Sequence, residues 1–119
     1  MYDEALADRI RAELSRQIPF TERKMFGGLA FLINGHMACG VVRDELMVRT
    51  GPEWYEAALA MPHARPMDFT GRAMRGMVMV GQPAFAGDSL RYWVESAARF
   101  AGGLPPKAPG TAGRRRPRL

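Results

Sequence analysis

The sequence predicts an α+β fold, in which an N-terminal, a middle and a C-terminal helix pack on an antiparallel sheet. Three observations lead to this class: an amphipathic segment opens the chain, short apolar runs separated by turn residues follow it, and a strongly periodic segment comes later. Short apolar runs joined by tight turns are typical of antiparallel strands, and strands grouped between helices favour α+β over an alternating α/β fold.

The first helix is expected over residues 3–17, DEALADRIRAELSRQ. Leu6, Ile10 and Leu14 recur at helical spacing and form one apolar stripe, while charged residues occupy the other faces. Asp3 stands just before the first apolar residue, where its carboxylate can accept hydrogen bonds as the N-cap. This segment therefore has both a start signal and a face to bury.

Four strands are expected next, and short turns join them. Their ranges are 22–26, 29–33, 36–42 and 46–50. Gly27-Gly28 lets the chain turn or bulge between the first two strands. Asn34-Gly35 is the strongest short hairpin signal, because a type I′ turn needs a positive φ at both central positions.

The glycines of RKMFGGLAFLINGHMACGVV (23–42) do not form a nucleotide-binding loop. A P-loop needs G-x-x-x-x-G-K-[ST], and a dinucleotide fingerprint needs G-x-G-x-x-G between a strand and a helix. Neither spacing occurs here, and a strand rather than a helix follows Gly27-Gly28. We therefore interpret these glycines as turn residues.

The second half of the chain is expected to hold a helix, a strand and a closing helix. Residues 52–60 look helical, and residues 61–71, with two prolines, are expected to be irregular or weakly extended. Residues 72–80 form the last expected strand. The clearest helix of the chain spans residues 88–102, with Asp88 as its cap and apolar residues at the 3.6-residue period.

The charge of the chain divides it into a domain, residues 1–103, and a basic tail, residues 104–119. The domain segment holds 12 Lys and Arg against 12 Asp and Glu, whereas the tail holds five cations and no acid, so the net charge of +5 lies in the tail. The tail is also rich in Pro and Gly. We expect it to be disordered, because little of it can be buried.

Candidate catalytic and metal-ligating residues are few. His36 and His63 are the only histidines and Cys39 is the only cysteine. His36 and Cys39 are three residues apart on an expected strand, which points them to opposite faces, and a closed zinc site needs four ligands. Cys39 lies among apolar neighbours, where a cysteine is usually inert. We expect no catalytic site, no metal and no cofactor, so an enzyme or small-molecule binder is the least favoured function.

Methionines gather on or beside the expected strands. They are Met25, Met37, Met47, Met67, Met74, Met77 and Met79. One interpretation is adaptable filler in a sheet covered on both faces. The other is a face, including Met77 and Met79, that contacts a partner chain or a second copy, since flexible methionine surfaces re-pack around different ligands.

Two stretches, KMFGGLAFLINGHMACGVV and ELMVRTGPEWYEAAL, resemble the N-terminal domain of the TfoX/Sxy competence-regulator family. That family shows a Met-Phe-Gly-Gly opening, a small-turn hairpin and a following strand that ends in Arg or Lys. RPMDFTGRAMRGMVMV, the helix with Trp93 and LPPK (104–107) are similar to its small stand-alone members. The resemblance covers roughly residues 1–107.

The resemblance implies an α+β fold like that of secretion chaperones and no known catalytic activity. Full-length members carry a second domain and act in transcriptional activation of DNA-uptake genes, together with a cyclic-AMP-responsive activator. Arg49 and Arg72 match charged positions of the family-like strand and Gly-Arg step, so they are candidate partner-binding residues. The alternative for both is a solvated strand edge.

The function expected from these observations is a non-enzymatic regulatory or adaptor module that acts through protein contacts. Its partner would be another protein, such as a transcription activator, or a second copy in a homodimer. The absence of a long apolar run and of a targeting peptide predicts a cytoplasmic protein with no membrane contact.

The alternative is a small basic protein that binds nucleic acid non-specifically through its tail. The arginines in question are Arg114, Arg115, Arg116 and Arg118. Neutralising up to four phosphates would give a log–log salt slope of about −4 at most. A solubilising end with no partner remains the other interpretation of this tail.

Overall fold

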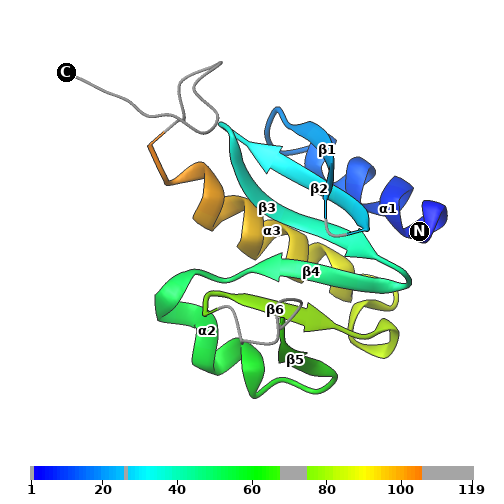
Figure 1. The fold of residues 1–119 in the computed structure, drawn as a ribbon, viewed down its shortest axis with the longest axis vertical. Helices are drawn as coiled ribbons and strands as arrows, with labels where there is room; N and C mark the ends of the chain where they lie inside the picture. Colours follow the sequence, from blue (N-terminus) through cyan, green and yellow to red (C-terminus); the bar gives the residue numbers. More distant parts are fainter. Residues whose placement is uncertain (1, 26, 68–74, 106–119) are drawn as a thin grey trace.

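The computed structural model describes residues 2–25, 27–67 and 75–105, and the α+β class expected from the sequence is confirmed (Figure 1). The helices of this described part are α1 (Glu4–Ser15), α2 (Gly51–Leu59), the short 3-10 helix η1 (Gln82–Phe85) and α3 (Ser89–Gly102). The strands are β1 (Thr21–Met25), β2 (Gly28–Ile33), β3 (His36–Val42), β4 (Glu45–Arg49), β5 (Ala64–Pro66) and β6 (Met77–Val80).

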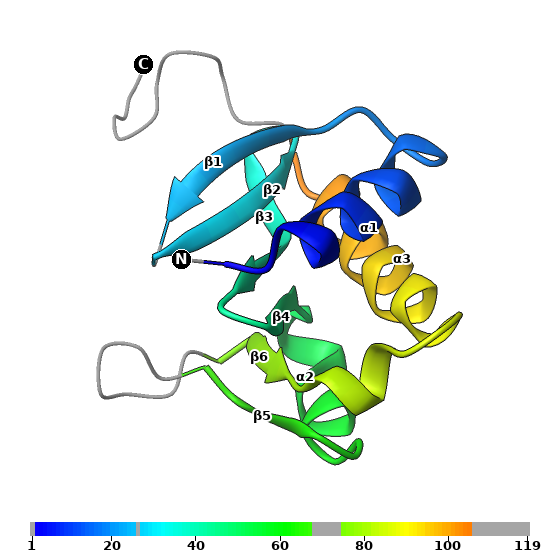
Figure 2. The same cartoon turned by 90° about the vertical axis from the view of Figure 1, so that its right-hand side faces the viewer.

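The six described strands form one antiparallel sheet in the order β1-β2-β3-β4-β6-β5. The chain meanders from β1 to β4, and β6 then pairs with β4, which leaves β1 and β5 as the sheet edges. Helices α1 and α3 lie side by side on one face of the sheet (Figures 1 and 2). None of the described helices is long and apolar enough to cross a membrane.

Helix α1 begins as the sequence predicts. The Asp3 carboxylate accepts hydrogen bonds from the backbone N–H groups of Ala5 at 2.9 Å and Leu6 at 3.1 Å. The apolar stripe of the helix, which includes Leu6, Ile10 and Leu14, is buried. Side-chain capping and one-sided burial together fix where this helix starts and which face meets the sheet.

Helix α1 is tied to the edge strand β1 by an ion pair. Arg11 Nε donates to the Glu22 carboxylate at 2.6 Å, and Arg11 Nη1 donates to Asp8 at 2.7 Å. The hydrogen bond from Arg11 lowers the pKa of Glu22 below its usual range. The Arg11–Glu22 ion pair therefore joins the edge strand β1 to the helix layer.

The hairpin between β2 and β3 has the predicted turn. Asn34 has φ 55 and Gly35 has φ 85, as a type I′ turn requires. The register slips once, because Phe31 pairs with Cys39 while Leu32 pairs with Met37. One extra residue in β3 therefore forms a β-bulge.

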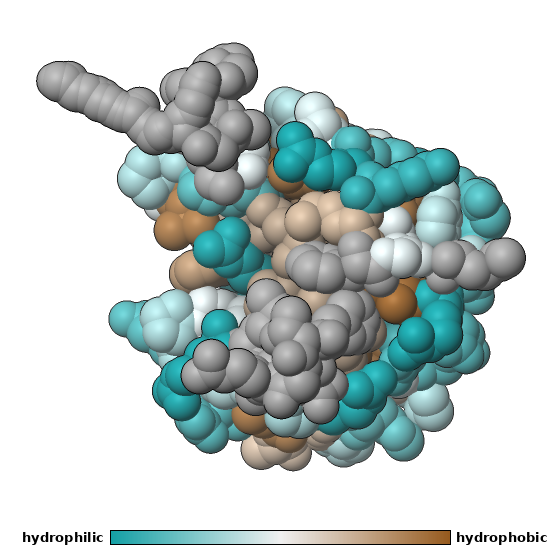
Figure 3. All heavy atoms as spheres, viewed as in Figure 1, coloured by the Kyte–Doolittle hydropathy of each residue, from teal (hydrophilic) through white to brown (hydrophobic). Residues whose placement is uncertain are grey.

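The sheet is apolar on both faces. The helix-covered face belongs to the larger core, which includes Phe31, Val48 and Val78 together with Trp93 of α3. The opposite face carries a second buried cluster, formed by Ala30, Val42, Met47, Met67, Met77 and Met79. Figure 3 shows apolar residues in the middle of this second face and hydrophilic residues around them. Met47, Met67, Met77 and Met79 are buried, which favours the interpretation that the methionines fill a covered face of the sheet.

Two local expectations differ from the structure. Asp88 stands at the N-cap position of α3, but its side chain makes no capping hydrogen bond, and its backbone is already helical with φ −74 and ψ −10. The cap prediction was therefore wrong in its mechanism. In the strand expected over residues 72–80, β6 begins only at Met77, because Gly76 adopts φ 87 in a turn. Residues 72–74 lie outside the described residues.

Gly40 lies in the middle of the sheet, opposite Ala30 on one side and Met47 on the other. A Cβ added there would lie 2.5 Å from the carbonyl oxygen of Leu29 and 2.5 Å from Met47 Cε. The backbone oxygen cannot move without displacing β2. Any side chain at this position therefore overpacks the sheet.

We predict that Gly40→Ala lowers the free energy of unfolding by about 1–3 kcal/mol, because overpacking in a filled core costs that much. Urea denaturation followed by circular dichroism measures the change. Gly103→Ala is the control, since an added Cβ there meets its nearest atom, the carbonyl oxygen of Arg99, at an ordinary 3.4 Å. Equal stability of the two variants would contradict the packing described here.

Candidate functional site

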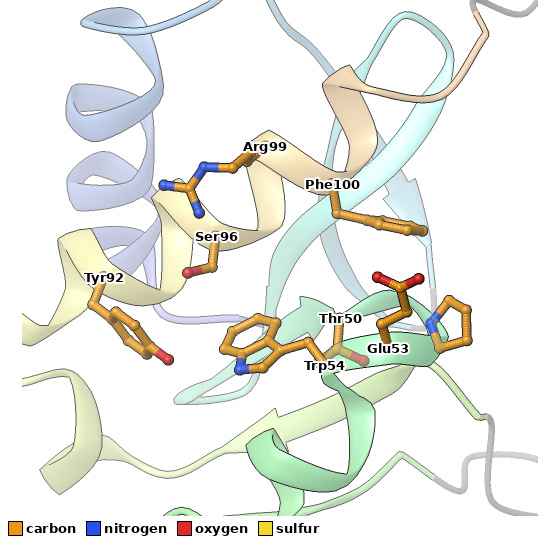
Figure 4. A pocket seen from close by; sticks show the side chains of 8 residues that line it. Thr50, Glu53, Trp54, Tyr92, Ser96, Arg99 and Phe100 are labelled. Atoms are coloured by element: carbon orange, nitrogen blue, oxygen red, sulfur yellow. The ribbon is translucent and has the colours of Figure 1, made fainter.

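Two adjoining depressions lie where β4 passes into α2 and where the last turns of α3 pack against that corner. The first, which we call the aromatic groove, has a volume of about 560 Å³ and lies between α2 and α3 (Figure 4). Its lining residues are Thr50, Pro52, Glu53, Trp54, Tyr92, Ser96, Arg99 and Phe100.

The second depression, which we call the arginine cleft, has a volume of about 350 Å³. Its lining residues are Met37, Arg49, Gly51, Pro52, Tyr55, Arg75, Gly76, Met77 and Phe100. Pro52 and Phe100 line both depressions, so these two side chains form the wall between them. A ligand that crosses this wall contacts both.

The corner between β4 and α2 is held by its backbone. Gly51 has φ 76, and a Cβ added there would overlap ring atoms of Phe100. The N–H groups of Thr50 and Gly51 both donate to the carbonyl oxygen of Gly76, at 2.7 and 3.3 Å. The buried Thr50 hydroxyl donates to the Gly51 carbonyl at 2.9 Å. The absence of a side chain at Gly51 therefore lets the Phe100 ring close over the corner.

Arg49 is the last residue of β4, and its half-buried side chain lies in the arginine cleft. Its guanidinium carbon lies 5.4 Å from the centroid of the Phe100 ring, which is cation–π distance. Its Nη1 donates to the carbonyl oxygen of Met37 at 3.3 Å. These two contacts hold the guanidinium at the cleft wall and leave its other N–H groups without a partner among the described residues.

Arg75 enters the same cleft from the turn before β6. Its guanidinium carbon lies 5.5 Å from the centroid of the Tyr55 ring, and its side chain is exposed. Within residues 2–25, 27–67 and 75–105, no carboxylate lies within ion-pair distance of Arg75 or of Arg49. The cleft therefore presents two positive charges that the described structure does not neutralise.

The aromatic groove has an apolar wall and a polar rim. Trp54 and Tyr92 meet edge to face with ring centroids 5.9 Å apart, and the Ser96 hydroxyl points between them (Figure 4). Tyr92 is 44% exposed, and it is the one large hydrophobic side chain that is exposed in the described part of the chain. Glu53 and Arg99 stand at the rim without an ion-pair partner among the described residues.

The candidate residues from the sequence fall in different places. Arg49 and Met77 both line the arginine cleft. Met79 is fully buried in the second apolar cluster and presents no free surface. Arg72 lies outside the described residues, as do the tail arginines Arg114, Arg115, Arg116 and Arg118. The proposed role of each of these residues in binding remains a prediction.

Sequence reasoning missed Arg75, Trp54, Tyr92 and Phe100 as site residues; Phe100 was counted only among the residues at the apolar period of the closing helix. One signal was available: Tyr92 lies off the apolar stripe of α3, on a face that is otherwise polar. An aromatic side chain on the polar face of an amphipathic helix indicates a contact beyond the core.

The cysteine and the two histidines lie outside the two depressions. Burial raises the pKa of the Cys39 thiol to about 12, so it carries almost no thiolate at neutral pH. His36 Nε2 donates a hydrogen bond to the backbone carbonyl oxygen of Pro105 at 2.6 Å. Among the described residues, no three His, Cys, Asp or Glu side chains are grouped as metal ligands. Because guanidinium groups do not titrate in proteins, the arginine cleft is suited to binding anions rather than to moving protons.

The profile of one protein family, described as the TfoX N-terminal domain, matches residues 12–101. The match runs from within α1 to the last turn of α3, so it includes both depressions and all six described strands. Searches of curated proteins and of solved structures gave no significant match.

The Gly51 corner gives a prediction with a matched control. Gly51→Ala lowers the free energy of unfolding in two ways. Backbone strain at the positive φ costs about 1–2 kcal/mol, and the overlap of the new Cβ with the Phe100 ring costs about 1–3 kcal/mol more. Gly87→Ala carries only the strain, because Gly87 has φ 57 and nothing within 4 Å of an added Cβ. Thermal and urea unfolding measure both losses.

We expect Gly51→Ala to lose more stability than Gly87→Ala and to change the near-ultraviolet circular dichroism of the aromatic groove. If the two substitutions cost the same and leave that spectrum unchanged, the Phe100 ring does not pack on Gly51 as described.

Proposed function

Because the chain belongs to the TfoX N-terminal domain family, we propose that it is a cytoplasmic regulatory or adaptor module that acts by contact with another protein and not by catalysis. The observation that carries this proposal is the pair of depressions at the β4–α2 corner. They place an exposed aromatic side chain beside two arginines that no described carboxylate neutralises.

The composition of this surface supports protein recognition. Tyrosine, tryptophan and arginine are enriched at the residues that dominate binding energy in protein interfaces. Trp54, Tyr92, Arg49 and Arg75 bring these three residue types together at one corner. Elsewhere on the described surface, large hydrophobic side chains are covered to a greater degree than Tyr92. The corner is thus the part of the described fold best suited to a partner.

Several features favour binding over catalysis. The single cysteine is buried, and the raised pKa of its thiol removes it as a nucleophile at neutral pH. Neither depression is lined by a histidine or a cysteine. General acid–base catalysis needs a group that titrates near the working pH, and the cations of these depressions are arginines.

The resemblance to full-length regulators suggests a transcription activator as the partner. A second copy of the chain would also satisfy the proposal, and the test below separates the two. Binding of nucleic acid through the tail rests on composition alone, and it too remains a prediction.

Photo-crosslinking in the producing cells tests the proposed function. Tyr92 is replaced by the photoreactive residue benzoylphenylalanine in the full chain, and the same residue is placed at Arg23 as a control. Both positions are exposed, but Arg23 lies on the edge strand β1, away from the corner. We expect a covalent protein adduct from position 92 that is absent from position 23 and survives nuclease treatment.

The mass of the adduct identifies the partner. Twice the mass of the chain indicates a homodimer, and any other protein mass indicates a separate partner. The absence of a nuclease-resistant adduct at position 92, or an equal adduct at position 23, would contradict the proposed function.

A further inference from the structure

We propose that the arginine cleft and the aromatic groove together bind a peptide segment in which an acidic side chain lies close to a large apolar one. The inference rests on the proposed function, because it gives the chemistry of the partner at the same corner. It extends that function by stating which two groups the partner must carry.

The arginine cleft fits the acidic group. Arg49 stacks on Phe100 and Arg75 on Tyr55, at centroid distances of 5.4 and 5.5 Å. Stacking occupies the faces of the planar guanidinium groups and leaves their N–H edges free, and those edges match a carboxylate in geometry. Arg49 uses one N–H on Met37, so most donors of the pair remain available within the described structure.

The aromatic groove fits the apolar group. Trp54 of α2 and Tyr92 of α3 meet edge to face, and together they supply the ring surface that lines the groove (Figure 4). Tyr92 is 44% exposed, so an apolar side chain that covers it removes ring surface from water. Removal of apolar surface from water is the main favourable term in most protein association.

The two depressions are close enough for one short segment. They share Pro52 and Phe100, so only one layer of side chains separates them. Side chains two positions apart on an extended segment lie on the same side, roughly 7 Å from each other. An extended segment that crosses Phe100 can therefore place an acid in the cleft and an apolar side chain in the groove.

Charge complementarity selects this occupant over two others. Residues 104–119 of the chain itself hold five cations and no acid, so they do not complement the two arginines. The carboxylate of Glu53 lines the groove with no ion-pair partner in the described part of the chain. It would repel the row of phosphates that a nucleic acid carries. A peptide can carry one acid to the arginines and an uncharged group past Glu53.

Selection from a random peptide library, displayed on phage, against the immobilised full chain tests the inference. We expect the selected peptides to place Asp or Glu within two or three residues of Phe, Trp or Leu. The best peptide is then synthesised with its acid and with the matching amide. Trp54 fluorescence reports binding, because Trp54 lines the groove while the other tryptophan, Trp93, is 1% exposed.

Arg75→Gln is the main variant, because Arg75 is exposed and its loss leaves the core intact. Arg23→Gln makes the same change in charge on β1 and is the matched control. We expect Arg75→Gln to lower the affinity for the acidic peptide at least tenfold and to leave the affinity for its amide form unchanged. Arg23→Gln should lower neither affinity. Thermal unfolding of each variant checks that the fold persists.

The inference is overturned if the selection gives no enrichment or enriches peptides without acids. It is overturned as well if the acidic and amide peptides bind equally, or if Arg75→Gln and Arg23→Gln have equal effects. A competition experiment adds a single-stranded thymidine oligonucleotide to the bound peptide. If the oligonucleotide displaces the peptide at a lower concentration than unlabelled peptide does, the corner binds nucleic acid and the inference is overturned.

If crosslinking at position 92 captures a protein but the peptide test fails, the adaptor function stands and the peptide inference is wrong. A failure of the crosslinking contradicts the adaptor function itself.

Discussion

The contact between the Phe100 ring and Gly51 is the constraint on which the proposed recognition corner depends. Gly51 turns the chain from β4 into α2 with φ 76, and the missing side chain admits the ring from the far end of α3. The ring in turn stacks with Arg49 and separates the two depressions. The absence of a side chain at Gly51 therefore lets β4, α2 and the end of α3 meet at the proposed binding surface, and a larger residue there would push the Phe100 ring away.

The rest of the fold explains why we place the proposed recognition site at a corner and not on the sheet. Both faces of the sheet carry buried apolar residues, including Phe31 on the helix side and Met47 on the other. A sheet filled on both sides is a stiff support, because packed interiors yield little. The corner at Gly51 lies at the end of β4, where backbone hydrogen bonds to Gly76 hold it, while its outer side chains remain in contact with solvent.

Sequence patterns predicted the fold because its signals are local. Asn34-Gly35 sets its own turn, and Asp3 caps the helix that follows it. At the proposed binding corner the only local signal is the position of Tyr92 on the polar face of α3, and its contact with Trp54 forms only on folding. Arg49 was found through the family resemblance, whereas Phe100 follows the apolar period of α3 and so looked like an ordinary core residue. Its half-buried position at the rim depends on the packing of α3 against α2, which no single segment encodes.

The most direct test of a recognition corner is a two-dimensional NMR titration of the full-length, nitrogen-15-labelled chain with the protein captured at position 92. The account predicts that amide signals of 51–55 and 92–100 shift together and saturate at one partner per chain. Signals of β1, residues 21–25, should stay in place because β2 and β3 separate that edge strand from β4. Shifts confined to β1, or to the tail beyond residue 105, would contradict the claim that the Gly51–Phe100 corner is the surface that binds.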